Sequence, residues 1–555
     1  MEKHTSLSCC VLLCLLNFLF FFGMQSNAIA QGIGDLGITN QQSSSSVDKA
    51  SSGPVLLGEI DVPIYIDRAE LSEMVREIAS QESQNAETLQ IHARWIRYLN
   101  GELQKVAPPE QAYLNTIQVE IEKKVEEINE RAGSNIFNIN RFWVLIAAFL
   151  VFFMQAGFKV LEVGMVRQVH GNTVGMKNLT DWLVVCLCYY TFGFALMFGD
   201  SWGFFGWNPQ FFMPTAEFFE TIIPNTSHNL GFEFFLYQLA FATTAVTIIS
   251  GATSERLPLV TYVFISIFVS MFLYPVFGHW TWSGYLLTGN EGWLAELGFH
   301  DFAGSTIVHS MGAWVALVAL WYIKPRNFWL KPDGEINDEY YKPSNLGYAV
   351  LGVFILWFSW WGFNGGSLFE FQPQVSSIIM NTNLSGAAAA LVAFFNALAV
   401  DKRFCYHMLI GGAIGGLVAI TACCDVVTPS EAIVIGIVAG FVHNYSYRFL
   451  RGFAFMGRRF DDAIGAIPVH GFCGVWGTFA VAVFGTPGAF NFAEVRLESV
   501  QVQLLGIVVA FVFAVVTSII FFEILKLLRI ARRISNNEEE FGYTVGSMLT
   551  IDRKK

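Results

Sequence analysis

The sequence has few charged residues. Asp, Glu, Lys and Arg make up 14% of the 555 residues, whereas 54% are hydrophobic and 53 are Phe. Soluble globular domains carry about 25% charged residues. The composition therefore excludes an ordinary soluble domain and indicates that the bilayer is the solvent for most of the chain. The net charge of -12 gives no support for a nucleic-acid partner, and we expect none.

Cysteines at metal-ligand spacing are also missing. Of the nine cysteines, Cys9, Cys10 and Cys14 fall in the N-terminal segment. The others lie in or beside apolar segments, where a free thiol behaves as a small hydrophobic group. These are Cys186, Cys188, Cys405, Cys423, Cys424 and Cys473. We therefore predict no disulfide framework, no metal site and no cofactor.

Residues 1–30 have the layout of a secretory signal peptide. Lys3 precedes the apolar run 10–22, and a small-residue cleavage site ends at Ala30. The alternative interpretation is a first membrane helix. Residues 31–65 include a Ser-rich stretch, and we expect them to form a flexible linker.

Residues 66–135 alternate apolar and charged side chains at helical spacing. The pattern is interrupted once, at Pro108 and Pro109. Because Pro disrupts the interior of a helix, the pattern predicts two amphipathic helices in an extracytoplasmic hairpin. Nothing in this region resembles a catalytic or ligand-binding motif.

From Phe142 onward the chain is a series of apolar segments. Each is near the ~20 residues that a helix needs to cross a ~30 Å hydrocarbon core. We count eleven, which begin near residues 140, 180, 231, 258, 303, 346, 377, 406, 429, 463 and 502. The predicted fold is therefore an all-α membrane protein, with eleven transmembrane helices in residues 138–533 and a tail at 534–555.

Lys and Arg are absent from two of the loops. Neither occurs between Gly199 and Gly231 or between Trp282 and Asp301. They accumulate in the alternate loops, at Arg167, Lys177, Arg256, Lys324, Arg326, Lys331, Lys402, Arg403, Arg448, Arg451, Arg458 and Arg459. Positive residues favour the cytoplasmic side. We therefore predict a multi-pass protein of the cell (inner or plasma) membrane, with its N-terminus outside and its C-terminus in the cytoplasm.

Two segments share the pattern D-x-x-G-x-x-x-V-H. They run from Asp301 to His309 and from Asp462 to His470, at the start of the fifth and tenth predicted spans. Because each half would contain an odd number of helices, the halves would have opposite orientations, which predicts a five-plus-five inverted repeat. Each His lies eight residues after its Asp, ~12 Å along a helix. We therefore expect both histidines close to the membrane midplane.

A His inside a membrane is costly and by default marks a functional path. For His309 or His470 alone, a helix-packing role is the alternative. Metal binding is less favoured, because no intramembrane carboxylate or Cys cluster converges on the pair. Two neutral imidazoles can hydrogen-bond each other and line a dry pore with nitrogen donors and acceptors. Such a line suits a small polar solute that sheds or shares a proton.

Asp301 and Asp462 open their helices. A carboxylate at that position accepts backbone N–H bonds and favours the positive end of the helix dipole. We favour this structural role, with an indirect effect on cation binding as the alternative.

Around these residues the sequence resembles the ammonium transporter/methylammonium permease/Rhesus family, on its Amt branch. The segment from Asp301 to Leu317 is similar to that family's signature, with Ser305 where a second Gly is usual. Further matching stretches are 154–158, 176–179, 251–256, 361–367 and 469–477. The likeness runs from about Asn138 to Arg533. It implies an ammonium transporter domain at 138–533, which forms a homotrimer with one pore in each subunit.

The resemblance also implies site residues. The substrate site for ammonium, or for methylammonium, combines an aromatic cage, a hydroxyl and a supporting aspartate, which here are Trp282, Phe241, Ser367 and Asp301. The pore gate is a pair of stacked phenyl rings and the pore lining is a pair of histidines, which here are Phe241, Phe363, His309 and His470. Trp280 competes with Trp282, because the loop after Pro275 differs in length from the usual form. Without the resemblance, each aromatic would more often be a packing or interfacial residue, and Ser367 could equally be a small residue between helices.

The resulting hypothesis is a channel or transporter that conducts ammonium, either as ammonia plus a relayed proton or as the net cation. The alternatives are an ammonium sensor with a transporter fold, a Rhesus-type gas channel and a membrane enzyme. No output domain is recognisable, Trp282 argues against the Rhesus type, and no nucleophile or metal set surrounds the histidines, so we expect no enzymatic activity. The tail differs from the usual family motif between Glu540 and Gly546, which argues against regulation by a PII-type protein.

Overall fold

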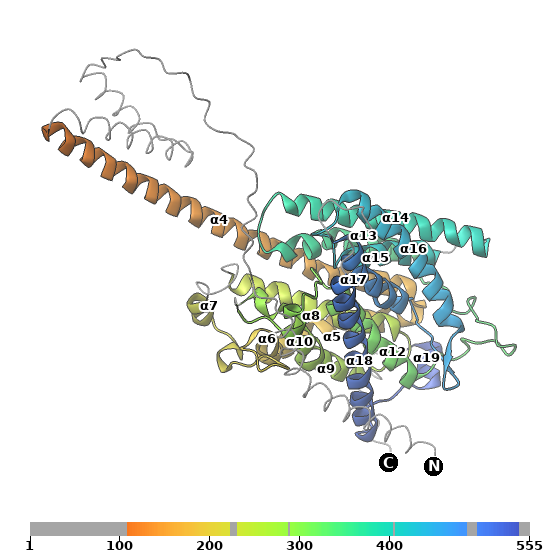
Figure 1. Ribbon diagram of the computed structural model, residues 1–555. Helices are drawn as coiled ribbons and strands as arrows, with labels where there is room; N and C mark the ends of the chain where they lie inside the picture. The colour runs from red at the N-terminus through yellow and green to blue at the C-terminus, as the bar shows by residue number, and fades with distance from the viewer. Residues whose placement is uncertain (1–107, 223–229, 287–288, 403–405, 486–496, 543–555) are drawn as a thin grey trace. The chain divides into compact units, whose positions relative to one another are not determined.

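The computed structural model describes residues 108–222, 230–286, 289–402, 406–485 and 497–542. Within them the regular structure is helical except for one short hairpin, in which β1 (Ala454–Phe455) pairs antiparallel with β2 (Arg458–Arg459). The chain separates into two units, Met1–Ser134 and Asn135–Lys555. Figure 1 traces the helices in chain order.

Of the first unit, the structure describes residues 108–134, which are the first part of helix α4 (Pro108–Met165). Pro108 and Pro109 begin this helix, where a missing backbone N–H costs no hydrogen bond. α4 continues without interruption past residue 135, where we expected the hairpin to end. The predicted signal peptide, the linker and the first helix of the predicted hairpin lie outside the described residues. The domain boundaries therefore stay predictions.

The second unit consists of apolar helices. After α4 they are α5 (Gly171–Cys188), α6 (Phe194–Phe198), α8 (Phe232–Ala252), α9 (Leu259–Phe268), α10 (Tyr274–Trp282), α12 (Met311–Ile323), α13 (Leu346–Gly365), α14 (Gln374–Asp401), α15 (Tyr406–Ile420), α16 (Pro429–Gly452), α17 (Cys473–Phe484) and α18 (Leu497–Leu527). Three short helices lie between or after them: α7 (Ala216–Ile222), α11 (Trp293–Glu296) and α19 (Asn536–Phe541). α5 joins α6, and α9 joins α10, through π-helical turns at Tyr189–Gly193 and Val269–Leu273.

Ten helical spans in the described residues are long and apolar enough to cross a membrane. The apolar segment predicted near residue 406 forms α15, whose 15 described residues make it shorter than the other ten. The chain is therefore an all-helical protein with many candidate membrane helices, as the sequence predicts. The count of eleven spans stays a prediction.

Helices α14, α15 and α16 approach one another through small residues. A Cβ atom on Gly416 of α15 would lie 2.5 Å from the Cβ of Ala389 on α14 and 2.6 Å from the backbone oxygen of Ser385. A Cβ on Gly436 of α16 would collide with the same Ser385 backbone. In a bilayer, close backbone approach supplies the van der Waals contact that hydrophobic burial does not. The packing of these three helices therefore depends on glycine.

Ion pairs join the loops at the ends of several spans. Arg326 Nη2 lies 2.8 Å from Asp461 Oδ1, and Arg326 Nη1 lies 3.5 Å from Glu255 Oε2. Arg167 Nε lies 2.8 Å from Glu255 Oε2, and Arg256 Nη1 lies 3.4 Å from Asp461 Oδ2. We call these five residues the ion-pair cluster. Burial raises the pKa of Glu255, but Arg326 and Arg167 more than offset that effect, so the pKa lies below its ordinary value.

Helix α19 lies against the ion-pair cluster. Its first turn carries a capping box between Ser535 and Glu538. Arg167 Nη2 donates to the backbone oxygen of Glu539 at 2.7 Å, and the buried Glu539 side chain pairs with Arg533. The backbone N–H of Asn327 also donates to the Glu539 carboxylate. The start of the tail is therefore held by the loops of the helical unit.

Candidate functional site

Asp301 fixes the turn that precedes His309. Its two carboxylate oxygens accept, at 2.8 to 3.0 Å, the backbone N–H bonds of Gly304, Ser305, Thr306 and Ile307. Gly304 has a φ of +106°, which side chains disfavour. The next six residues, Ser305–Ser310, form a π-helical turn that carries His309. Burial raises the pKa of Asp301, and the four N–H groups offset part of that rise.

Asp462 repeats this arrangement before His470. Its oxygens accept backbone N–H bonds from Gly465 at 3.0 Å and from Ile467 at 2.7 Å. Gly465 has a φ of +81°, and Ile467–Phe472 is again π-helical. The capping role predicted for both aspartates is therefore confirmed. The shared pattern encodes one local structure twice, a carboxylate-capped turn with positive φ at the Gly, followed by the segment with the histidine.

The two histidines meet. The Nδ1 atoms of His309 and His470 lie 3.2 Å apart, and the ring centroids are 5.2 Å apart at an interplanar angle of 23°. The side chains are 0% and 4% exposed. Because the two Nδ1 atoms share one hydrogen, one ring donates and the other accepts. His309 Nε2 is buried and has no hydrogen-bond partner within the described part of the chain, so it is available to a small solute.

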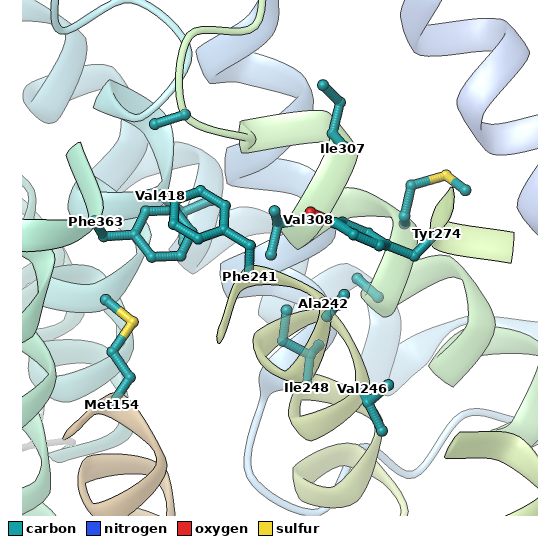
Figure 2. Packing of buried hydrophobic residues seen from close by; sticks show 14 of the residues in the cluster. Met154, Phe241, Ala242, Val246, Ile248, Tyr274, Ile307, Val308, Phe363 and Val418 are labelled. Atoms are coloured by element: carbon teal, nitrogen blue, oxygen red, sulfur yellow. The ribbon is translucent and has the colours of Figure 1, made fainter. Parts of the chain in front are cut away.

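Phe241 of α8 and Phe363 of α13 stack face to face beside the histidines. Their ring centroids are 3.9 Å apart at an angle of 9°, and Figure 2 shows the overlap of the two rings. The Phe363 centroid lies 5.4 Å from that of His309. Both phenyl side chains are buried. The stacked phenyl pair therefore places apolar carbon directly beside the His309 ring.

Trp282 of α10 lies next to Phe241. The row of side chains therefore runs from Trp282 through Phe241, Phe363 and His309 to His470. The Trp282 ring centroid lies 6.1 Å from that of Phe241, with the rings edge to face. Trp282 Nε1 donates to the backbone oxygen of Asp301 at 2.9 Å, which ties the indole to the capped turn. The ring of Tyr285 stacks on it at 6.0 Å and 22°. Asp301 therefore supports the Trp282 ring through its backbone and the histidine segment through its carboxylate.

Trp280 has different neighbours. Its ring lies 4.8 Å from Phe513 and 5.0 Å from Phe204 between centroids, and its Nε1 donates to the backbone oxygen of Phe204 at 2.6 Å. Residues two positions apart are about 200° apart around a helix, so the two tryptophans face opposite ways. Of the two candidates, Trp282 is the one that the structure brings next to Phe241.

Ser367 lies at the C-terminal end of α13, close to the phenyl pair. Its Oγ donates to the backbone oxygen of Phe363 at 3.0 Å and lies 3.1 Å from the hydroxyl of Tyr237. The Tyr237 hydroxyl also donates to the Phe363 oxygen at 2.6 Å, and its ring lies 4.6 Å from that of Phe241. The structure therefore brings Ser367 together with both phenyl rings, through the backbone of one and a tyrosine that contacts the other.

The sequence did not single out three aromatic residues of the site, Tyr237, Tyr285 and Trp360. Trp360 stacks on His309 at 5.1 Å between centroids and 21° between planes. It precedes Phe363 by three residues, as Tyr237 precedes Phe241 by four. That spacing places each pair on one helix face, and it was the signal that could have found them. Tyr285 carries no comparable signal.

A small cavity of about 30 Å³ lies on the far side of the histidine pair. It is lined by His470, Glu162 and His407 and otherwise by apolar groups. The order through the site is therefore Trp282, the phenyl pair, the histidine pair and this cavity.

The row is buried and mostly apolar, with imidazole nitrogens at its centre. No group of three or more His, Cys, Asp or Glu side chains within the described residues could hold a metal ion. Ring faces attract a small cation, whereas crossing the phenyl pair as a bare charge would be costly. The arrangement therefore favours a small solute that can exchange a proton with the imidazoles.

The chain is similar to known proteins over most of its length. Residues 142–548 match the model of the Ammonium Transporter Family. Ammonium transporter Amt2 of Archaeoglobus fulgidus is 38% identical over 424 residues, which cover 74% of this chain and 87% of that protein. Ammonium transporter 3 of Dictyostelium discoideum is 34% identical over 409 residues, which cover 70% of this chain and 88% of that protein.

Two solved structures have a similar fold. A protein named Sensor Amt Protein superposes with a TM-score of 0.68 at 36% identity, over 75% of this chain and 99% of that one. Mep2 of Saccharomyces cerevisiae superposes with a TM-score of 0.62 at 25% identity, over 74% of this chain and 92% of that one.

Proposed function

Because this chain belongs to the ammonium transporter family, we propose that it conducts ammonium across a cell membrane through the row of side chains from Trp282 to His470. The observation that carries the proposal is the direct contact of the two imidazoles beside a stacked phenyl pair. Each imidazole nitrogen can donate or accept a hydrogen. The imidazoles therefore let a solute exchange a proton within a row of side chains that is otherwise mostly apolar.

The outer substrate site is the aromatic face formed by Trp282 and Phe241, with the hydroxyl of Ser367 beside it. A small cation over such faces gains ~0.5 to 2 kcal/mol per contact when it is desolvated. The Ser367 oxygen donates its own hydrogen to Phe363, so it retains lone pairs for an N–H of ammonium. Asp301 acts indirectly, because its backbone oxygen orients the indole.

The phenyl pair and the histidines separate ammonium from alkali ions. Phe241 and Phe363 form the pore gate, and an ion that passes them loses its hydration. Ammonium can leave its proton at the outer side or pass it along the imidazoles. An alkali ion has no proton to give and is excluded. The two forms of the proposal, ammonia with a relayed proton and net ammonium, both move one positive charge per solute, whereas passage of ammonia alone moves none.

The architecture that goes with this function has eleven spans in a five-plus-five inverted repeat. The paired Asp-capped turns support the repeat, since the same local structure precedes each histidine. The distribution of Lys and Arg supports an N-terminus outside and a C-terminus in the cytoplasm. We further propose a homotrimer without enzymatic activity and an extracytoplasmic helical hairpin at residues 66–135, and the sequence of the tail argues against a PII-type regulator.

Replacing either histidine tests the proposal. His309→Ala or His470→Ala removes the proton-exchanging contact, and we expect methylammonium uptake to fall about tenfold or more, which is ~1.4 kcal/mol on the barrier. The assay is initial uptake in cells that lack their own ammonium transporters. His443→Ala is the matched control, because His443 is a buried histidine that bonds Asn444 outside the row.

Wild-type uptake in both variants would refute the pore assignment, whereas His443→Ala should stay within about twofold of wild type. Current measured in reconstituted vesicles under an ammonium gradient separates both forms of the proposal from passage of ammonia alone. Current proportional to flux supports net charge transfer, and flux without current supports ammonia alone.

An ammonium sensor is the second candidate function. The specific observation in its favour is the similarity to the solved structure named Sensor Amt Protein. A sensor would keep the aromatic site but conduct little. Binding of methylammonium that is abolished by Trp282→Leu, without measurable uptake by the wild type, would support the sensor over the transporter.

A further inference from the structure

Glu162 lines the cavity behind the histidine pair but has no part in the path described above. It lies on α4, is 1% exposed, and shares the cavity wall with His470. Ser250 of α8 donates its hydroxyl hydrogen to Glu162 Oε2 at 2.9 Å. A Cβ on Gly251 would stand 2.4 Å from Cδ1 of Ile464 and 3.4 Å from Oε1 of Glu162, so the glycine lets Ile464 pack beside the carboxylate. A carboxylate is therefore built into the wall of an otherwise apolar cavity.

The charges around Glu162 do not balance. Lys177 is 1% exposed, its Nζ has no hydrogen-bond partner within the described part of the chain, and it interacts electrostatically with Glu162. Asp181 is a second buried carboxylate that also acts on Glu162. With all three ionised, two negative charges face one positive charge, and Arg256 and Glu255, which also act on Lys177, add one charge of each sign. A buried charge without compensation is costly, so the group favours one further proton or cation.

Of the two carboxylates, only Glu162 can bind a cation that enters the cavity. The Asp181 oxygens accept hydrogen bonds from the hydroxyls of Tyr262 and Thr247 and from the backbone N–H of Trp182. Asp181 does not belong to the cavity wall, whereas Glu162 does. The excess negative charge therefore faces the cavity at Glu162.

Other titratable groups near the cavity add no second anion. His470 and His407 belong to its wall, and His407 Nδ1 is buried without a hydrogen-bond partner within the described residues. Tyr262 of α9 already donates to Asp181. Glu162 is thus the carboxyl group of the wall.

We propose that Glu162 forms an inner cation site, which binds ammonium or protonated methylamine in the cavity beyond His470. The inference rests on the proposed function, because the solute reaches this cavity through the histidine pair. An N–H of the cation donates to the carboxylate, beside the contacts that Ser250 and Asn178 make with it, as a charge-assisted hydrogen bond. The site holds the solute at the exit of the path and neutralises the buried charge while it does so.

Transport measured from each face tests this site. Right-side-out and inside-out membrane vesicles from expressing cells are supplied with labelled methylammonium, and KM is measured for each face. We expect Glu162→Gln to raise KM at the inner face about tenfold, through the loss of one charge-assisted hydrogen bond. KM at the outer face should stay within about twofold, because the aromatic site is unchanged. Glu162→Asp should restore part of the inner-face affinity.

Asp181→Asn is the matched control, because it removes the other buried carboxylate but leaves the cavity wall intact. It removes part of the negative charge but not the hydrogen-bond acceptor in the wall, so KM at the inner face should rise by less than in Glu162→Gln. An equal rise in both variants, or no rise in Glu162→Gln, overturns the inner site while transport itself stands. If the wild type takes up no methylammonium from either face, the proposed function fails as well.

Ser250→Ala provides a second route if Glu162→Gln does not fold. It removes the hydroxyl that positions the carboxylate but keeps the charge. We expect a smaller rise in KM at the inner face only. A rise of the same size at both faces would instead show a general loss of structure and would contradict the site.

Discussion

The two tryptophans of α10 differ in what each ring touches. Trp282 contacts Phe241 and is held by the backbone of Asp301, whereas Trp280 packs against Phe204 and Phe513. Both are nearly fully buried, so burial does not distinguish them. The neighbouring side chains do distinguish them. They predict that substitution of Trp282 affects substrate binding and that substitution of Trp280 affects stability.

Trp282→Leu should weaken substrate binding. Loss of one cation–π contact of ~0.5 to 2 kcal/mol corresponds to a rise in KM for methylammonium of about 2- to 30-fold. KM at the outer face of right-side-out vesicles is the measurement. Trp280→Leu is the matched control, and we expect it to lower the melting temperature while leaving KM within about twofold. A larger shift of KM in Trp280→Leu than in Trp282→Leu would contradict the assignment.

At the residue scale, the sequence predicted the histidine contact but not all of its surroundings. The repeated pattern specified the histidines because it fixes a capped turn and a helical distance, which are local quantities. It did not single out Trp360 or Tyr237, because helical spacing places them on the same faces as Phe363 and Phe241 but does not show which rings they contact, such as the His309 ring beside Trp360. The resemblance left Trp282 and Trp280 open, because the loop after Pro275 differs in length from the usual form of the family.

Helix α16 gives a test at the scale of the element. Gly436 faces the backbone of Ser385 on α14, whereas the space around a Cβ on Gly452 at the other end of α16 is open. Gly436→Ala should destabilise the protein by about 1 to 3 kcal/mol through overpacking. Thermal unfolding in detergent, followed by size exclusion, measures the effect.

Gly452→Ala serves as the comparison for this substitution. Ala is favoured over Gly in a helix by up to ~1 kcal/mol, so this variant should be neutral or slightly more stable. If both variants unfold at the wild-type temperature, the close packing of α14 and α16 does not limit stability.

The prediction of helices was most accurate where a long apolar run was bounded by charged loops. The segments near residues 231, 346 and 429 begin α8, α13 and α16 close to where the sequence placed them. The segment near 406 forms the shorter α15, in which Gly411, Gly412, Gly415 and Gly416 serve close packing with neighbouring helices. The length of an apolar segment does not indicate how closely its helix packs against others. It also did not predict that α4 continues without a break past residue 135.

The ion-pair cluster acts at the scale of the whole molecule, because it ties loops that are far apart in the sequence. Burial raises the pKa of Asp461, but Arg326 and Arg256 more than offset it and lower the pKa to about 2. A carboxyl with a lowered pKa stabilises the fold above its unfolded pKa and loses that contribution as the pH falls through the folded value. For Asp461 the loss therefore occurs between about pH 4 and pH 2.

Asp461→Asn should therefore destabilise the protein at pH 7 by about 2 kcal/mol or more. The difference from wild type should shrink as the pH falls below about 4, since the wild-type carboxyl then becomes protonated. Melting temperatures of both proteins in detergent between pH 3 and 8 provide the measurement. A difference that is independent of pH would show that the ion pairs do not supply this stability.

The paired Asp-capped turns have one more consequence. They present the same backbone on either side of the imidazole contact, so the scaffold itself does not rectify flow, and the direction of net movement follows the gradient. Any rectification must come from side chains that differ between the two ends, with indole and phenyl rings at one and the carboxylate of Glu162 at the other. A variant in which these two ends were made alike would conduct equally well in both directions.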